Sequence, residues 1–474
     1  MAAGSRVRRS LVAGAVGLGV LMAPAVSTAA PGDGPRYTAG ASGAGDSYFP
    51  FAGNGGYDVQ HYDLDITYTP PAPAPAPLSG QFEGVAAIQV RATQDLDRFN
   101  LDFRAFDITS LEVNGHAARF IRDGEQELVI TPRPKLKVGK AFTVETTYAG
   151  IPPVITDPDE SIEGWIPTSD GAFVVNEPQG SPGWFPVNDI PTDKATYTID
   201  VTVPEGRTAI SNGVLVEQVT AGGRTTWRWR EDNPMASYLT TATNGIFGLT
   251  VRETADGIPI YDAVDPTRSG ANLAREPEII AFLSGLVGPY PFDAAGGTVD
   301  AAPNVGYALE SQTKANYSSS PGLSTVVHEI AHQWFGNSVT LSTWDDIWLN
   351  EGFARWSEWR WTEAQPGGRT AQQQFDITYN SPNTVWTPPP GDVGGPESMF
   401  SSPVYTRGAL TLQALRQKIG EASFTTLLRR WYAENKDGNV TTADFVALSE
   451  DVSGQQLDAF FETWLYTPDR PASW

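Results

Sequence analysis

Residues 328–332 read His-Glu-Ile-Ala-His, and residues 348–352 read Trp-Leu-Asn-Glu-Gly. Ser320-Pro321 is a typical helix start and Gly336 is a typical stop, so we predict a helix between them. The two histidines are four residues apart, which places both rings on one helix face, within reach of one metal ion. Two of the chain's four histidines lie in this pentapeptide, which argues against a chance match.

The same two stretches contain a full set of catalytic zinc ligands. Zinc in such a site takes three protein ligands and keeps one position open for water. We predict His328, His332 and Glu351 as the ligands, because the spacing after His332 leaves room for a turn and a second helix beginning near Thr343 and Asp346. Glu329 lies on the same side but out of register, so it is the candidate general base that acts on a zinc-activated water.

These stretches resemble the M1 family of zinc metallopeptidases, the aminopeptidase N-like gluzincins, through HEIAHQWFGN and the later WLNEGFA. The resemblance runs from about residue 55 to the end of the chain. It implies an α+β fold, with an N-terminal all-β domain followed by a thermolysin-like, mostly α catalytic domain. It also implies a short two-domain form that lacks the C-terminal helical domain often found in the family.

The resemblance assigns further residues to the site. Tyr405 stands where the family has its catalytic tyrosine, whose hydroxyl would help to stabilise the oxyanion. Glu310 and Glu177 stand at positions that bind the free ammonium of the substrate. Gly306 and Leu309 would belong to the substrate-binding segment, with Leu309 lining the pocket for the first side chain.

Some positions depart from the family pattern in this region. Leu309 replaces the usual Met, Ser311 replaces the usual Asn, and Val175 stands where a Gln often assists. The resemblance therefore implies aminopeptidase activity, with changed contacts to the amino-terminal residue of the substrate.

The composition restricts the partners. The formal net charge of −23 argues against nucleic acid and anionic membranes. The chain has no cysteine, so disulfides and thiolate ligands are excluded and only histidines and carboxylates can hold a metal. We predict one Zn²⁺ per chain and peptides with a free amino terminus as substrates.

Residues 1–29 have the composition of a signal peptide. Arg6, Arg8 and Arg9 form a basic beginning, an apolar run follows, and Ser27-Thr28-Ala29 offers a cleavage site. Arg8-Arg9 raises a twin-arginine route of export. We therefore predict a secreted, extracellular protein with no stable membrane association after cleavage.

Composition and pattern predict the remaining division of the chain. Residues 30–50, rich in Gly, Ala, Ser and Pro, are expected to be a disordered lead-in. Residues 51–247 should form the β-domain, with hairpin turns at Asn114-Gly115 and Asp123-Gly124. Residues 248–474 should form the zinc peptidase domain, with a strand edge over 306–310, a loop over 380–400 that could rim the site, and helices over 279–287, 405–418, 424–435, 442–451 and 456–466.

The leading hypothesis is thus a secreted zinc aminopeptidase. One alternative is a zinc metalloendopeptidase with the same metal site in a more open binding region, which an N-blocked peptide would reveal. A second alternative is a non-catalytic binding scaffold, against which the complete set of ligands and the candidate base argue.

Overall fold

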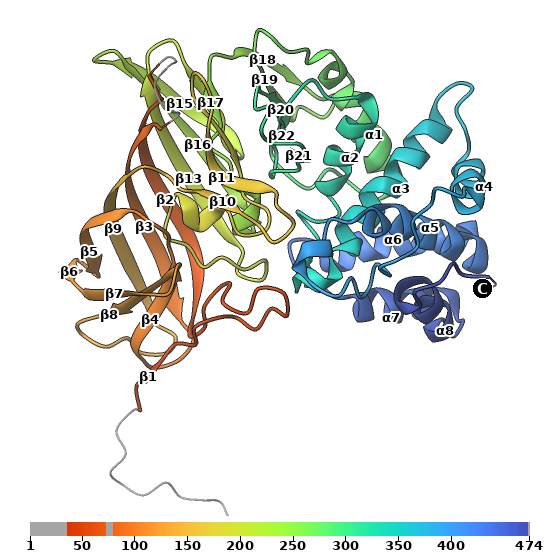
Figure 1. The fold of residues 1–474 in the computed structure, drawn as a ribbon, viewed down its shortest axis with the longest axis horizontal. Helices are drawn as coiled ribbons and strands as arrows, with labels where there is room; N and C mark the ends of the chain where they lie inside the picture. The colour runs from red at the N-terminus through yellow and green to blue at the C-terminus, as the bar shows by residue number, and fades with distance from the viewer. Residues whose placement is uncertain (1–35, 73–78, 473–474) are drawn as a thin grey trace, which may run out of the picture. The chain divides into compact units, whose positions relative to one another are not determined.

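One long sheet organises the β-rich part of the chain, drawn in red to yellow-green in Figure 1. Its strand order is β15-β16-β13-β2-β3-β9-β5-β6. Apolar and polar residues alternate along the central strand, so Tyr62, Leu64 and Ile66 are buried on one face. The strands are β2 (Tyr57–Thr69), β3 (Gln81–Ala92), β5 (Asp107–Val113), β6 (His116–Ala117), β9 (Ala141–Gly150), β13 (Ala195–Pro204), β15 (Val214–Ala221) and β16 (Arg224–Met235).

Two smaller sheets complete this part. The first has the order β1-β4-β8-β7 and the second the order β10-β11-β12-β17-β14. Both predicted hairpins are present, and Asn114 and Gly115 turn the chain with φ of 53° and 71°. The strands are β1 (Thr38–Ala39), β4 (Leu96–Asp102), β7 (Arg119–Asp123), β8 (Glu127–Thr131), β10 (Val154–Thr156), β11 (Ile162–Pro167), β12 (Ala172–Val175), β14 (Thr208–Ala209) and β17 (Asn244–Gly245).

The computed structural model describes residues 36–72 and 79–472. The predicted signal peptide and the first residues of the predicted disordered lead-in lie outside these ranges. The lead-in prediction is wrong for its described part, because Thr38 pairs with Leu96 and the ring of Phe49 is buried. Asp46 also accepts a hydrogen bond from the backbone N–H of Trp344 at 2.8 Å. These contacts are long-range, so composition alone could not reveal them.

The second part of the chain begins with a further sheet, which has α1 between two of its strands, where the sequence predicted mostly helix. The order is β18-β19-β20-β22-β21, and the predicted strand edge is present as β21. Helix α1 follows β19 and overlaps the helix predicted over 279–287, and helix α2 follows β22. The elements are β18 (Gly248–Glu253), β19 (Pro259–Val264), α1 (Glu276–Leu286), β20 (Ala295–Val299), β21 (Ala308–Leu309), β22 (Ala315–Tyr317) and α2 (Leu323–His332).

Helices make up the rest of the chain, teal to blue in Figure 1, and overlap each range predicted to be helical. They are α3 (Trp348–Ala364), α4 (Ala371–Asn380), α5 (Ser402–Ile419), α6 (Glu421–Asn435), α7 (Thr442–Ser453) and α8 (Asp458–Phe461), with β23 (Thr340–Leu341) and β24 (Asn439–Val440) between them. The predicted α+β arrangement, a β-rich part followed by a helical part, is confirmed. Within the described ranges, no helix has the length and apolar character needed to cross a membrane.

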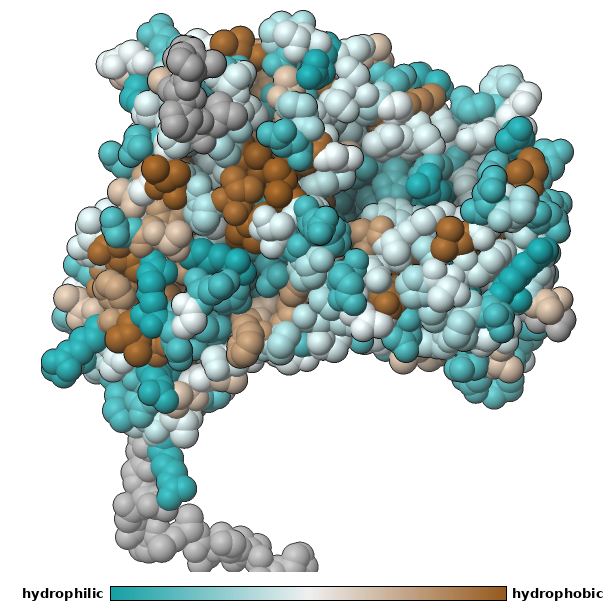
Figure 2. Space-filling view, in the orientation of Figure 1, coloured by the Kyte–Doolittle hydropathy of each residue, from teal (hydrophilic) through white to brown (hydrophobic). Residues whose placement is uncertain are grey.

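Buried polar contacts fasten the two parts together near the candidate site. The Nζ of Lys194, which precedes β13, donates to the carbonyl oxygens of Asn337, Ser338 and Gly438 at 3.2, 3.0 and 3.0 Å. The hydroxyl of Tyr238 donates to the carbonyl of Gly336 at 3.2 Å. The turn after α2 is therefore held from the β-rich side. On the face shown in Figure 2, exposed apolar side chains gather mainly over the β-rich part, at the left.

Candidate active site

The first two candidate ligands lie on α2. The helix begins at Leu323 with Gly322 at its N-cap, two positions later than Ser320-Pro321 predicted, and Gly336 lies beyond its end. His328 and His332 share one face, as their spacing requires, and their ring centroids are 4.7 Å apart. Both side chains are buried, so they are held by packing before any metal binds.

The third candidate ligand, Glu351, lies in the first turn of α3 and faces the histidines. Its Oε2 is 2.9 Å from Nε2 of His328 and 3.5 Å from Nε2 of His332. The short turn at Trp344–Asp346 lies between Thr343 and α3, so the predicted N-terminal box precedes this turn and not the helix itself. Two ring nitrogens and one carboxylate oxygen converging on one point fit a zinc ion.

The ring nitrogens turned away from this point have other partners. Nδ1 of His328 is 2.9 Å from Oε1 of Glu358, and Nδ1 of His332 is 3.0 Å from the carbonyl oxygen of Phe335. Such contacts select the tautomer that leaves Nε2 free for a metal. Sequence reasoning missed Glu358, although its position two helical turns after Glu351 predicts the same face.

Glu358 has further partners of its own. Its Oε2 accepts hydrogen bonds from the hydroxyl of Ser324 and from Nη1 of Arg355, the latter at 3.0 Å. Burial opposes its charge, but the contact with His328 outweighs burial and holds the pKa of Glu358 below its usual value. The carboxylate is therefore charged and can orient the His328 ring.

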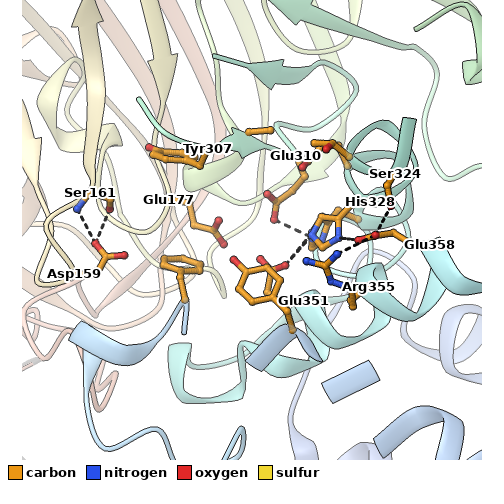
Figure 3. Close-up of a pocket in the computed structure, with 16 residues that line it drawn as sticks. Asp159, Ser161, Glu177, Tyr307, Glu310, Ser324, His328, Glu351, Arg355 and Glu358 are labelled. Atoms are coloured by element: carbon orange, nitrogen blue, oxygen red, sulfur yellow. Dashed lines mark hydrogen bonds and ion pairs between the residues drawn. The ribbon is translucent and has the colours of Figure 1, made fainter. Parts of the chain in front are cut away.

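A cavity of about 390 Å³ opens in front of the metal-binding group (Figure 3). Glu329 lines it and is buried on α2 between the histidines. Tyr405, in the first turn of α5, also lines it, and its ring stacks on that of His328 with centroids 5.9 Å apart. The predicted base and the predicted oxyanion donor thus face the same space as the ligands.

Glu177 and Glu310 line the same cavity from different parts of the chain. Glu177 follows β12 and Glu310 follows β21, and Figure 3 shows the two carboxyl groups in the same space. Oε1 of each residue is buried without a hydrogen-bond partner in the described structure. Buried carboxylate oxygens without a partner are costly, which makes them suited to a cationic ligand.

The pKa shifts in the cavity also indicate a site for a cationic ligand. Burial, and then the charge of Glu310, raise the pKa of Glu177 well above its usual value. Burial is also the main reason why the pKa of Glu310 is raised. Burial likewise raises the pKa of Glu351, but His332 and His328 outweigh it and lower this pKa to about 2. Burial therefore disfavours the charged forms of Glu177 and Glu310, and a cation bound between them would stabilise these carboxylates.

Two predicted site residues do not line the cavity. Gly306 is exposed and lies outside the lining, and the side chain of Leu309 packs into an apolar cluster with Val175 and Val305. Successive residues of a strand point to opposite faces, so Ala308 and Glu310 face the cavity and Leu309 faces away. The prediction that Leu309 lines the pocket is therefore wrong.

The structure adds lining residues that sequence reasoning missed. Tyr307, Arg355, Asp159 and Ser161 line the cavity, and Phe400 does so from the loop that was expected to rim the site. The hydroxyl of Tyr307 donates to the carbonyl oxygen of Ile162 at 2.8 Å, which fixes its ring across the two parts of the chain. Tyr307 lies inside the predicted segment 306–310, and Arg355 shares the helical face of Glu351, but no local motif marks the other positions.

Comparison with known proteins places this geometry in a family. The model of the peptidase M1 N-terminal domain matches residues 58–239, and that of the peptidase family M1 domain matches residues 306–464. The chain is 28% identical over 312 residues to aminopeptidase M1-D of Oryza sativa subsp. japonica, covering 59% of this chain and 35% of that protein. It is 25% identical over 454 residues to aminopeptidase A of Gloydius brevicauda, covering 85% of this chain and 46% of that protein. The chain thus spans between a third and a half of the length of these relatives.

Solved structures agree along nearly their whole length. The M1 zinc metallopeptidase from Deinococcus radiodurans superposes with a TM-score of 0.82 at 28% identity, covering 90% of this chain and 98% of that chain. A variant of that enzyme bound to a Tyr-Ser-Ala substrate gives a TM-score of 0.82 and covers 99% of its own chain.

Proposed function

The chain belongs to peptidase family M1, and on this premise we propose that it is a zinc-dependent aminopeptidase, which hydrolyses the first bond of peptides with a free amino terminus. The main support is that Glu177 and Glu310 face the metal-binding group across one cavity, each with a buried oxygen that has no hydrogen-bond partner in the described structure. A substrate ammonium would satisfy these oxygens and bring the first peptide bond to the metal.

His328, His332 and Glu351 would hold one zinc ion. When bound, the ion would act as a Lewis acid that lowers the pKa of a water molecule and polarises a carbonyl group. Glu358 and the carbonyl of Phe335 hold the two imidazole rings in the tautomer that binds through Nε2.

Glu329 would move the proton. Its carboxylate takes a proton from the attacking water and passes it to the nitrogen of the leaving amine. Glu329 is buried beside the ligands and lines the cavity, where a substrate would lie. The Tyr405 hydroxyl would donate a hydrogen bond to the oxyanion that forms at the attacked carbonyl. Its ring is fixed by stacking on His328, so the donor is already oriented.

Two predictions about the whole chain remain part of the proposal. The basic and apolar character of residues 1–29 supports export to the outside of the cell, with removal of that segment. A division near residue 247 is supported by the change from the β-rich part to the sheet-and-helix part that carries the metal ligands.

The test is a panel of aminoacyl-arylamides and matching N-acetylated peptides, assayed with zinc and with a chelator. The wild type should hold about one zinc per chain, hydrolyse free-amine substrates and lose activity with the chelator. Glu329→Gln should keep zinc and lose turnover, and Tyr405→Phe should lower kcat by ~10²–10³ at unchanged zinc content. His328→Ala should lose both metal and activity.

Two results would contradict the proposal. Full turnover by Glu329→Gln would eliminate its role as base. Cleavage of N-acetylated peptides at internal bonds as fast as free ones, with Glu310→Ala indifferent to the block, would identify an endopeptidase that uses the same metal site.

A further inference from the structure

The cavity has two buried carboxyl groups on one side of the metal-binding group and an arginine on the other. Glu310 lies on the side of His332, with its Oε1 3.8 Å from Nδ1 of that ring, and Glu177 lies beyond it. Arg355 lies on the side of His328, next to Glu358. Figure 3 draws Glu177 on one side of Glu351, and Arg355 and Glu358 on the other. Among the cavity-lining residues that the structure describes, Arg355 is the one arginine or lysine.

The Arg355 guanidinium has donors left for a ligand. Arg355 comes one helical turn after Glu351 on α3, so the two side chains share a face. Its Cζ lies 6.0 Å from the centre of the Tyr405 ring, and its Nη1 donates to Glu358. Nη2 has no partner in the described structure, and 39% of the side chain is exposed. The free edge of the guanidinium is therefore available beside the predicted oxyanion donor.

The proposed binding mode determines which part of a substrate meets this edge. The ammonium lies at Glu177 and Glu310, and the first carbonyl lies at the metal. Each further residue of an extended chain adds about 3.3–3.6 Å. The second residue, which leaves with the amine, therefore lies on the side of His328 and Arg355.

We propose that Arg355 binds a carboxylate of this second residue, so that the enzyme favours substrates in which that residue is acidic or carries the free carboxyl end. The inference rests on the proposed aminopeptidase function and adds a substrate class to it. A guanidinium fork matches a carboxylate in geometry and charge. Two sources supply this chemistry: the side chain of Asp or Glu at the second position, and the α-carboxylate of a dipeptide.

The other charges in the cavity would disfavour binding of a substrate carboxylate if Arg355 were absent. The cavity is lined by six carboxylates: Asp159, Glu177, Glu310, Glu329, Glu351 and Glu358. A substrate carboxylate would be repelled by these groups unless a cation met it. Removing the guanidinium should therefore change the preference for carboxylate substrates into a preference for the matching amides.

The experiment compares four substrates that share one accepted N-terminal residue X. X-Glu-amide against X-Gln-amide measures the side-chain carboxylate, and X-Ala against X-Ala-amide measures the α-carboxylate. The wild type should favour at least one carboxylate form by about fivefold in kcat/KM, as for a charge-assisted bond at a partly exposed site. Added salt should reduce the preference, because exposed charges are screened.

Variants test whether Arg355 causes the preference for carboxylate substrates. Arg355→Gln should prefer the amide substrates, and Arg355→Lys should keep part of the preference for carboxylates. Arg360→Gln is the matched control: it removes an arginine from the same helix, where it pairs with Glu363 at 3.1 Å and does not line the cavity. This control should keep the wild-type ratio.

Binding supplies a second readout that does not depend on turnover. In the Glu329→Gln background, calorimetry should show tighter binding of the favoured carboxylate substrate than of its amide. Adding Arg355→Gln should remove that difference. Circular dichroism and zinc content identify a variant that is misfolded, and in that case the Arg355→Lys ratio decides.

Three outcomes are distinguishable. A carboxylate preference that disappears with Arg355→Gln supports the inference, and its source is the pair that shows it. Turnover of all four substrates with equal kcat/KM in each pair overturns the inference and leaves the aminopeptidase function intact. Absence of turnover on every free-amine substrate overturns the proposed function, and the inference with it.

Discussion

Glu358 is the residue whose removal should change metal binding without removing a ligand. Its Oε1 is the hydrogen-bond partner of Nδ1 of His328. Loss of such a partner typically lowers metal affinity by about 10- to 100-fold. Glu358→Ala should therefore weaken zinc binding by that factor in a competition titration with a chromophoric chelator.

The control for this prediction lies on the same helix. Glu363→Ala removes a carboxylate that pairs with Arg360 outside the cavity and should leave zinc affinity at the wild-type value. Equal affinity in Glu358→Ala and the wild type would show that His328 needs no support from this carboxylate.

At this scale, sequence could identify groups that lie close together along the chain. The pairing of His328 with His332 follows from helical periodicity and Glu351 from its spacing after His332, and the structure brings the three to one point. The meeting of Glu177 with Glu310 required the family resemblance, since they come from separate sheets. Leu309 was misplaced because the face of an edge strand depends on its pairing, which no local pattern determines.

Helices α3 and α5 pack so closely that neither tolerates a side chain at their crossing. A Cβ atom on Gly408 of α5 would lie 2.8 Å from Cα of Gly352 on α3. The two helices carry Glu351 and Tyr405, so their separation sets the distance between a candidate ligand and the candidate oxyanion donor. We expect Gly408→Ala to push the helices apart.

The expected result has two components. Overpacking should lower the free energy of unfolding by roughly 1–3 kcal/mol, measured by chemical denaturation. Displacement of Tyr405 should also reduce kcat, because a shift of ~1 Å at a reacting group can cost about 10²-fold. Gly285→Ala on α1, where a Cβ meets no neighbour within 4 Å, should be neutral or stabilising. Similar stability and rate in both variants would refute the packing account.

Among the elements, the long helices and strands were the most predictable. The predicted range 424–435 lies within α6, and the alternation near Tyr57 marks β2, because both patterns repeat over several turns or residues. Short strands such as β12, buried along its length, carry no alternation and were missed. Apart from the predicted edge at β21, the sheet from β18 to β22 was missed for a related reason: its strands are short, and the parallel pairs β19–β20 and β20–β22 join partners that lie far along the chain.

Across the whole molecule, buried carboxyl groups should make stability depend on pH. Burial, the largest cause, raises the pKa of Asp189 and of Asp193 to about 7. In the unfolded chain the same groups ionise near pH 4. Between about pH 4 and 7 the folded state therefore binds more protons than the unfolded state, so the free energy of unfolding falls as pH rises through this window.

The measurement is the Tm of zinc-loaded protein between about pH 5 and 7, inside this window. The wild type should lose stability with rising pH, and Asp189→Asn should flatten this slope, because an amide still accepts the hydrogen bond from Ser237 Oγ but cannot ionise. Asp256→Asn removes an exposed carboxylate and should keep the wild-type slope. An unchanged slope in Asp189→Asn would show that another group controls the pH dependence.

The contact between Asp46 and the backbone of Trp344 has a consequence for how the chain is made. Ribosomes synthesise proteins from the amino end, and early segments fold as units before later ones appear. The strands from β2 to β16 can pair as they emerge, whereas Asp46 and Phe49 must wait for Trp344, almost three hundred residues later. The segment with Asp46 and Phe49 thus reaches these partners long after it is made, and until then the Phe49 side chain is available to chaperones.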